Sequence, residues 1–354
     1  CIQLSVTMNL ALLLLLPASA AYTSLDELLN LMPDHIELMR RVLAIATDPR
    51  VDVESRVEAL QAMQELVEDL DKAEDLRTIH GFAPIVELLN NALTREEGAE
   101  PRLVETAAWV IGTAAQNHRD LQLHMLQVEA LHPLAAIVRM AASPADDVAK
   151  AKAKAMYAIS AIIRNNPDGQ WACAEAACGK ALVCAAQSRE SRLARKALVL
   201  LSDLTHETLA AAAAKESGRP TYDGHLHSAR PREPFWTFID REELCWAVCN
   251  NLTTRDLDLD TWEKAVIALK YMHAAGMLQY DAAYGTEDVS CRRNGVPQAL
   301  HSIVAACDVV MATQIGPAGC VEVLELARNL QRQLAEGRPS PKIRSSETVF
   351  HWEV

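Results

Sequence analysis

The feature of this sequence that most restricts its fold is a helical motif that recurs at a fixed interval. Segments that begin at Glu58, Thr106 and Lys154 align their small and apolar residues at an interval of 48 residues. A fourth copy begins at Lys196, and a looser fifth copy begins at Lys264. Such periods are typical of armadillo or HEAT repeats, whose units bury their apolar faces only against one another. We therefore predict an all-α, armadillo/HEAT-like right-handed superhelical solenoid.

The composition favours helix and narrows the classes of partner. Hydrophobic residues make up 50% of the chain but aromatic residues only 5%, so alanine and leucine supply most of the apolar surface. The formal net charge is −13, and an acidic chain lacks the positive field that phosphate backbones and acidic membrane surfaces attract. We expect no nucleic acid and no membrane as a partner, and we expect a monomer.

Breaks in the apolar pattern divide the chain into predicted segments. They are a signal peptide at 1–20, an armadillo-like core at 21–210, an insertion loop at 211–240, C-terminal helical repeats at 241–336 and a disordered tail at 337–354. The polar stretch from Ser217 to Pro234 is rich in glycine and proline, and it is either a binding element or a tolerated surface insertion. The NNPDG cluster at 165–169 predicts a helix break.

The N-terminal region resembles a secretory signal. An apolar run from Leu10 to Leu16 precedes Pro17 and the small residues 18–20, which predicts cleavage after Ala20. The run is too short to span a bilayer as a helix. No lysine or arginine precedes it, however, and Cys1 stands before Met8. A buried N-terminal helix is the alternative.

The cysteines leave the redox compartment open. There are nine, and removal of Cys1 with a signal leaves an even number, which permits disulfides without requiring them. Cys245 and Cys249 are four residues apart, so on a helix their Cβ atoms lie about 5–6 Å apart, farther than the roughly 3.5–4.5 Å of a disulfide. We expect most cysteines to be buried apolar residues. The sequon at Asn251 would be a glycosylation acceptor in a luminal protein.

No pattern in the sequence indicates an enzyme, a metal site or a cofactor. The acidic run from Asp256 to Asp260 imitates the start of a calcium loop, but Thr261 stands where glycine is needed and Ile267 where glutamate is needed. His225 and His227 have no metal-ligand motif near them. Glycine-rich phosphate loops and nucleophile elbows are also missing from the sequence. We therefore expect a binding protein.

Three segments in the repeat region resemble one protein family. They are AAWVIGTAAQN at 107–117, KAMYAISAIIRNN at 154–166 and RKAL at 195–198. In this order they are similar to the armadillo-type nucleotide-exchange factors of 70-kDa heat-shock chaperones, over about residues 50–210. That family has a cytosolic branch and a branch in the endoplasmic reticulum (ER) lumen that serves the chaperone BiP. The signal-like start favours the ER lumen and BiP, with the cytoplasm as the alternative.

The resemblance implies a binding mechanism without covalent chemistry. Such factors clamp lobe II of the chaperone ATPase domain with a concave face and open the nucleotide cleft, so that ADP leaves. The alternative is a generic armadillo scaffold that holds a peptide or protein without affecting nucleotide. The last helix of each repeat would form the concave face. Its candidate contact residues are Trp109, Thr113, Gln116, Asn117, Lys154, Tyr157, Arg164, Asn165, Arg195 and Lys196.

Each candidate also has a structural explanation. Trp109 and Tyr157 occupy the same aligned position and serve either partner contact or packing between repeats. Gln116, Asn117 and Asn165 either contact a partner or complete helix C-termini. The basic candidates are either ordinary solvated charges or a source of salt-dependent association with an acidic partner. Gly112 is expected to permit close helix packing.

Overall fold

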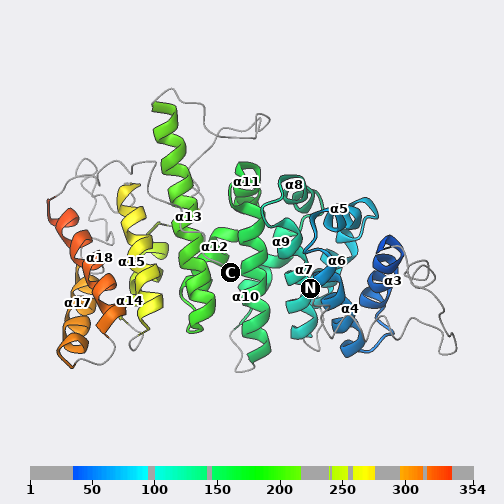
Figure 1. Cartoon of the computed structure of the whole chain (residues 1–354), viewed down its shortest axis with the longest axis horizontal. Coiled ribbons are helices and arrows are strands. Elements are labelled where there is room, and N and C mark those ends of the chain that lie inside the picture. Colours follow the sequence, from blue (N-terminus) through cyan, green and yellow to red (C-terminus); the bar gives the residue numbers. More distant parts are fainter. Residues whose placement is uncertain are drawn as a thin grey trace, which may run out of the picture. The chain divides into compact units, whose positions relative to one another are not determined.

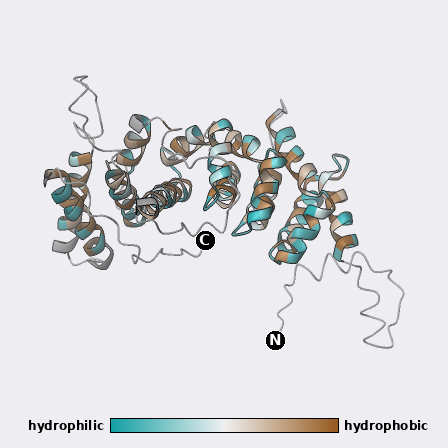
Figure 2. Cartoon of the chain, turned by 90° about the horizontal axis from the view of Figure 1, so that it is seen from above, coloured by the Kyte–Doolittle hydropathy of each residue, from teal (hydrophilic) through white to brown (hydrophobic). Residues whose placement is uncertain are grey.

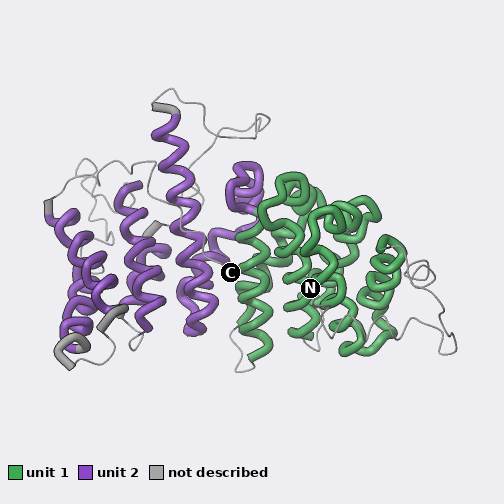
Figure 3. The backbone as a smooth tube through the Cα atoms, viewed as in Figure 1, with its two compact units in different colours: residues 1–162 green, residues 163–354 purple. Residues whose placement is uncertain are grey.

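The computed structural model describes residues 35–94, 100–141, 146–216, 239, 241–253, 258–275, 296–313 and 317–336. Within these ranges every regular element is a helix, which confirms the predicted all-α class. The chain divides into two compact units, residues 1–162 and residues 163–354, and each is described by itself (Figure 3). The predicted signal peptide, the stretch from Ser217 to Pro234 and the C-terminal tail lie outside the described residues.

Unit 1 is built from successive short and long helices (Figure 1). Its helices are α3 (His35–Thr47), α4 (Val53–Leu66), α5 (Leu70–Thr78), α6 (Phe82–Thr94), α7 (Pro101–Ala115), α8 (Arg119–Gln127), α9 (Leu131–Val138) and α10 (Asp146–Ile163). Equivalent helices of successive repeats pack in rows: α3 on α6 and α6 on α9, α4 on α7, and α5 on α8. This row arrangement is the stacking that a helical repeat requires.

Unit 2 repeats the pattern with pairs of helices. Its helices are α11 (Pro167–Glu175), α12 (Cys178–Ala186), α13 (Ser191–Glu216), α14 (Arg241–Thr253), α15 (Leu259–Ala274), α17 (Val296–Thr313) and α18 (Pro317–Glu336). One row runs through α12, α14 and α17, and a second row runs through α13, α15 and α18. Helix α13 continues to Glu216, so the helix extends past residue 211, where the sequence predicts that the insertion loop begins.

The aligned motifs fall on equivalent helices, and their apolar residues form the core. The first three motif copies lie on α4, α7 and α10, and the last two lie on α13 and α15. Ala107 and Ile111 on α7 are fully buried, as are Ala155 on α10 and Ala197 on α13. Most helices carry both hydrophilic and hydrophobic residues, as Figure 2 shows. The periodicity of the sequence therefore predicts the buried face directly.

Helix boundaries follow from local capping chemistry. The Asp52 side chain accepts a hydrogen bond from the Ser55 N–H (3.0 Å) and begins α4. The predicted break at 165–169 is confirmed, because α10 ends at Ile163, Asn166 caps α11 and Pro167 is the first residue of α11.

One described helix is long and apolar enough to cross a membrane by length and composition alone. It is the stretch Ser191–Ala214 of α13, with a mean hydropathy of 1.2. Its apolar residues Ala194, Leu201 and Leu204 are buried, and α13 packs on α12 and α15. Core helices of soluble proteins meet the same criterion, so this is weak evidence for a membrane span.

Candidate partner-binding surface

The structure brings together five of the predicted contact residues in unit 1. Trp109 and Thr113 lie on α7, Lys154 and Tyr157 lie on α10, and Gln116 follows the end of α7. We call these five residues the α7–α10 cluster. Gln116 is exposed, and the other four are partly exposed. The cluster therefore lies at the surface where the last helices of two successive repeats meet.

Lys154 and Trp109 form the charged part of the α7–α10 cluster. The Lys154 Nζ lies 3.6 Å from the centroid of the Trp109 ring and 5.8 Å from the centroid of the Tyr157 ring. An ammonium group over an aromatic face is attracted by the ring quadrupole. Burial raises the pKa of Glu105, and the charges of Lys150 and Lys154 oppose that rise. Lys154 is thus positioned by α7, with its charge close to a tryptophan that is partly exposed.

Tyr157, on α10, makes a close contact with α7. Its hydroxyl donates a hydrogen bond to the Gln116 Oε1 (2.9 Å). Burial raises the pKa of the Tyr157 phenol, and a hydrogen bond with Thr113 opposes that rise. The ring lies over Gly112, where an added Cβ would be 2.5 Å from Cδ1 and Cε1 of Tyr157. The predicted packing role of Gly112 is therefore confirmed.

One member of the surrounding network was missed at the sequence level. Gln64 on α4 donates to the Glu68 Oε1 (2.9 Å) and to the Thr113 Oγ1 (3.4 Å). These bonds connect the α7–α10 cluster to the preceding repeat. Gln64 is nearly fully buried (5% exposed), and a polar residue at a buried position of a repeat helix is the signal that could have identified it.

The two asparagines end helices. Asn117 and Asn165 have φ angles of 56° and 52°, in the left-handed region that commonly follows an α-helix. Asn165 is further fixed in unit 2, because its backbone N–H donates to the Glu207 Oε1 (3.1 Å). The helix-end explanation accounts for both residues, and their contact with a partner stays a prediction.

Two of the four basic candidates form ion pairs within unit 2. Arg164 lies 2.7 Å from the Asp203 Oδ2 on α13, and Arg195 lies 2.6 Å from the Asp260 Oδ2 on α15. Each charge is thus already balanced by a carboxylate within unit 2, which favours the structural explanation, and contact with an acidic partner stays a prediction. Lys196 is the next residue of α13 after Arg195 and is partly exposed.

We expect Arg164→Gln to affect stability rather than partner binding. Its side chain and that of Asp203 are 32% and 33% exposed, and ion pairs at such positions contribute about 0.5–1 kcal/mol. Urea unfolding of the variant should show a loss of this size. A drop in the salt dependence of partner binding at unchanged stability would contradict the structural role.

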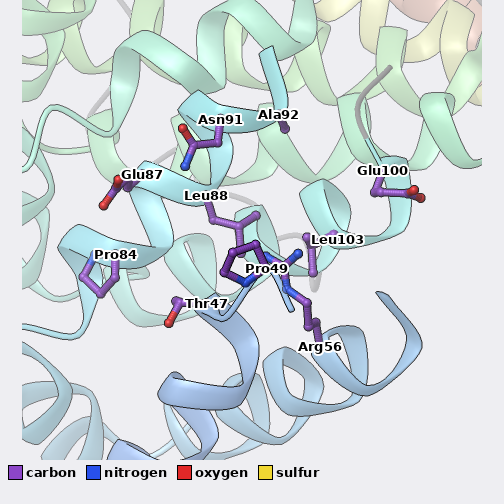
Figure 4. A pocket seen from close by; sticks show the side chains of 10 residues that line it. All are labelled: Thr47, Pro49, Arg56, Pro84, Glu87, Leu88, Asn91, Ala92, Glu100 and Leu103. Carbon is purple, nitrogen blue, oxygen red and sulfur yellow. The ribbon is translucent and has the colours of Figure 1, made fainter. Parts of the chain in front are cut away.

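The described part of unit 1 also contains a hollow that the sequence did not predict. It has a volume of about 380 Å³ and lies between the α3–α4 connection, α6 and the start of α7 (Figure 4). Leu88, Leu103 and Pro49 lie near its centre with the Arg56 side chain, and Glu87 and Glu100 lie at opposite sides (Figure 4). None of the predicted contact residues lines it. Its lining residues are Thr47, Pro49, Arg56, Pro84, Glu87, Leu88, Asn91, Ala92, Glu100 and Leu103.

The predicted cysteine and glycosylation features have different outcomes. Cys249 is a free thiol and Cys245 is disulfide-bonded, so the two do not pair with each other, as the spacing predicts. The glycosylation expectation is wrong for the folded chain. Asn251 is 2% exposed, and its amide donates to the backbone oxygens of Ala186 (2.7 Å) and Ala247 (2.8 Å).

The acidic residues at the start of α15 have structural partners. Asp258 caps α15 by accepting a hydrogen bond from the Thr261 N–H (3.2 Å), and Asp260 pairs with Arg195 and Lys264. Within the described ranges no group of three histidine, cysteine, aspartate or glutamate residues could hold a metal ion. His225 and His227 lie outside those ranges.

Comparison with protein families decides which family the repeats represent. The model of the SIL1/FES1/HPBP1 C-terminal domain matches residues 72–290. The chain belongs to this family. The match extends well beyond residue 210, where the similarity recognised in the sequence ends. A second model, of the nucleotide exchange factor Fes1, matches residues 17–76.

Several curated relatives carry the name "Hsp70 nucleotide exchange factor FES1". The protein of Mycosarcoma maydis is 33% identical over 131 residues, which are 37% of this chain and 30% of the relative. That of Coccidioides immitis is 29% identical over 143 residues, which are 40% of this chain and 62% of the relative. That of Saccharomyces cerevisiae is 31% identical over 137 residues, which are 38% of this chain and 44% of the relative. The chain thus matches less than two thirds of the length of these relatives.

Solved structures agree with the fold. Computationally designed armadillo repeat proteins for modular peptide recognition align with a TM-score of 0.50 and 14% identity, over 84% of this chain and 99% of theirs. An engineered protein aligns with a TM-score of 0.51 and 14% identity, over 82% of this chain and 98% of its own. At this identity the likeness supports the armadillo-like helical-repeat fold alone.

Proposed function

We propose that this protein is a co-chaperone that binds lobe II of the ATPase domain of a 70-kDa heat-shock chaperone and promotes ADP release. Membership of the SIL1/FES1/HPBP1 C-terminal domain family is the observation that carries this proposal. The relatives named as Hsp70 nucleotide exchange factors support it. The protein itself performs no catalysis in this proposal and needs no cofactor.

The α7–α10 cluster is the part of unit 1 that we assign to chaperone binding. It combines a tryptophan, a tyrosine and a lysine at a helix–helix junction, and aromatic residues are enriched among those that dominate binding energy. Gly112 and Gln116 hold the Tyr157 ring in place. A surface that is fixed before binding loses little side-chain entropy when a partner docks.

The exchange activity requires a difference in affinity. The protein must bind the open, nucleotide-poor conformation of the chaperone more tightly than the closed, ADP-bound one, because equal affinity for both shifts nothing. Linkage makes this effect reciprocal. ADP lowers the affinity of the chaperone for this protein, and this protein lowers the affinity of the chaperone for ADP by the same factor. A factor of about 5–150 is typical of such couplings.

We further propose BiP as the chaperone and the ER lumen as the compartment, with exchange activity in the cytoplasm as the alternative. The signal-like run before Ala20 supports the secretory pathway. Sequencing the N-terminus of protein from its native source tests this. A mature end at Ala21 would agree with secretion, and an intact Met8 would argue for the cytoplasm.

The exchange activity is tested by ADP release. BiP and a cytosolic 70-kDa chaperone are each loaded with a fluorescent ADP analogue, and this protein is added in excess with unlabelled ATP. We expect faster release from BiP, by about 5–150-fold at saturation if the coupling is expressed in the dissociation rate. Unchanged release from both chaperones would overturn the exchange proposal and favour the armadillo scaffold.

A further inference from the structure

Three helix corners in this chain share one backbone geometry. They join α5 to α6, α8 to α9 and α11 to α12, and each contains a left-handed residue: His80, Glu129 or Ala177, with φ between 56° and 58°. The N–H of the left-handed residue donates to the backbone oxygen three residues earlier, at 3.0, 3.2 and 3.2 Å. This pattern belongs to the Schellman motif, which closes a helix C-terminus.

The Schellman motif places two particular side chains in contact. One is the residue directly after the left-handed residue. The other lies five positions before that following residue in the chain. At the first corner the pair is Leu76 and Gly81, joined by a hydrogen bond from the Gly81 N–H to the Leu76 oxygen (2.9 Å). A Cβ built on Gly81 would lie 3.0 Å from the Leu76 Cγ. Any side chain at the Gly81 position therefore points at its partner.

At the α11–α12 corner both of these positions are cysteines. Cys173 and Cys178 are free thiols that are 0% and 2% exposed. Burial raises the pKa of the Cys173 thiol well above its ordinary value, and the neighbouring Cys178 thiol adds to that rise. The second corner has Met125 and Ala130 at the equivalent positions, so the cysteine pair is a property of this corner alone among the three.

We propose that Cys173 and Cys178 are a disulfide site that closes across the α11–α12 corner when the chain folds in an oxidising thiol–disulfide buffer. Both cysteines are buried in the folded protein, so an oxidant in solution reaches neither sulfur there. The bond therefore forms during folding, before the corner is buried. Once formed, it ties the end of α11 to the start of α12.

The chemistry is thiol–disulfide exchange with glutathione disulfide as the oxidant. One cysteine thiolate attacks the glutathione disulfide, forms a mixed disulfide and releases one glutathione thiolate. The second cysteine then attacks the protein sulfur of that mixed disulfide and releases the second glutathione. Two protein thiols are oxidised to one disulfide, one glutathione disulfide is reduced to two thiols, and the two protons pass to the glutathiones.

Peptide mapping tests the proposal. The full chain is refolded from denaturant with equal concentrations of reduced and oxidised glutathione, quenched, unfolded, treated with iodoacetamide and digested with trypsin. Residues 165–180 form one tryptic peptide that contains both cysteines and no others. We expect this peptide to carry no alkyl group and to be about 2 Da lighter than the dithiol form. Folded, reduced protein in the same buffer should close the bond at least about tenfold more slowly.

Two outcomes would overturn the proposal. One is a peptide with two alkyl groups after oxidative refolding, and the other is a peptide with a single glutathione adduct on each thiol. Cys173→Ala and Cys178→Ala should each abolish the lighter peptide, whereas Cys184→Ala, which changes a neighbouring cysteine on α12, should leave it intact. The readout does not depend on chaperone binding, so failure here is distinct from failure of the exchange function.

Discussion

Replacing Gly112 with alanine will destabilise the protein, although alanine is the better helix former. The added Cβ would lie 2.5 Å from two Tyr157 ring atoms and 3.1 Å from the Ala158 Cα, which is backbone and cannot turn away. Overpacking of this kind costs about 1–3 kcal/mol, and the helix propensity of alanine offsets up to about 1 kcal/mol. We expect a net loss of about 1–2 kcal/mol in the free energy of unfolding, measured by urea denaturation.

The same substitution in a Tyr157→Ala background separates the contact from other causes. Without the tyrosine ring, the nearest obstacle to the new Cβ is gone. Only the contact with the Ala158 Cα (3.1 Å) then remains, and the helix propensity of alanine offsets part of its cost, so Gly112→Ala should destabilise clearly less in this background. An equal loss in both backgrounds would show that the Tyr157 contact is not the cause.

The helical repeat could be predicted from the sequence because buried positions recur at regular intervals as small or apolar residues. Ala107 and Ile111 are fully buried, and they belong to a motif whose copies place small and apolar residues at the same positions. The start of α11 could also be predicted from the sequence. Asn166 caps the first turn of this helix and Pro167 is its first residue, so the signal is local. These features depend on residues close together in the chain, so one sequence contains the information.

Pairings across helices could not be predicted in this way. Arg195 reaches Asp260, which is 65 residues away, and Asn251 bonds to the Ala186 oxygen over the same separation. Both depend on how two packed helices orient their side chains, which apolar periodicity does not report. A basic residue and a sequon therefore looked available from the sequence, although the fold gives each a partner. The hollow lined by Leu88 and Leu103 was invisible for the same reason.

We expect Trp109→Ala to weaken chaperone binding more than any other single substitution in the α7–α10 cluster. The change removes a partly exposed indole and the ring that positions the Lys154 ammonium (3.6 Å). Loss of a binding hot spot costs about 2 kcal/mol or more, which is roughly a 30-fold increase in the concentration needed for half-maximal ADP release. The measurement is a titration of the variant against ADP-loaded BiP, with thermal unfolding recorded on the same sample.

A matched tryptophan and a matched lysine make this prediction specific to the cluster. Trp246 on α14 is 59% exposed, and Trp246→Ala should leave ADP release unchanged. Lys154→Gln should weaken binding and flatten its dependence on salt, because one positive charge near the partner is lost. Lys150→Gln, on the same helix, should change neither, since Lys150 is paired with Asp146 (2.7 Å). Equal effects of the two lysine substitutions would mean that the overall charge of α10, rather than the lysine held over Trp109, governs association.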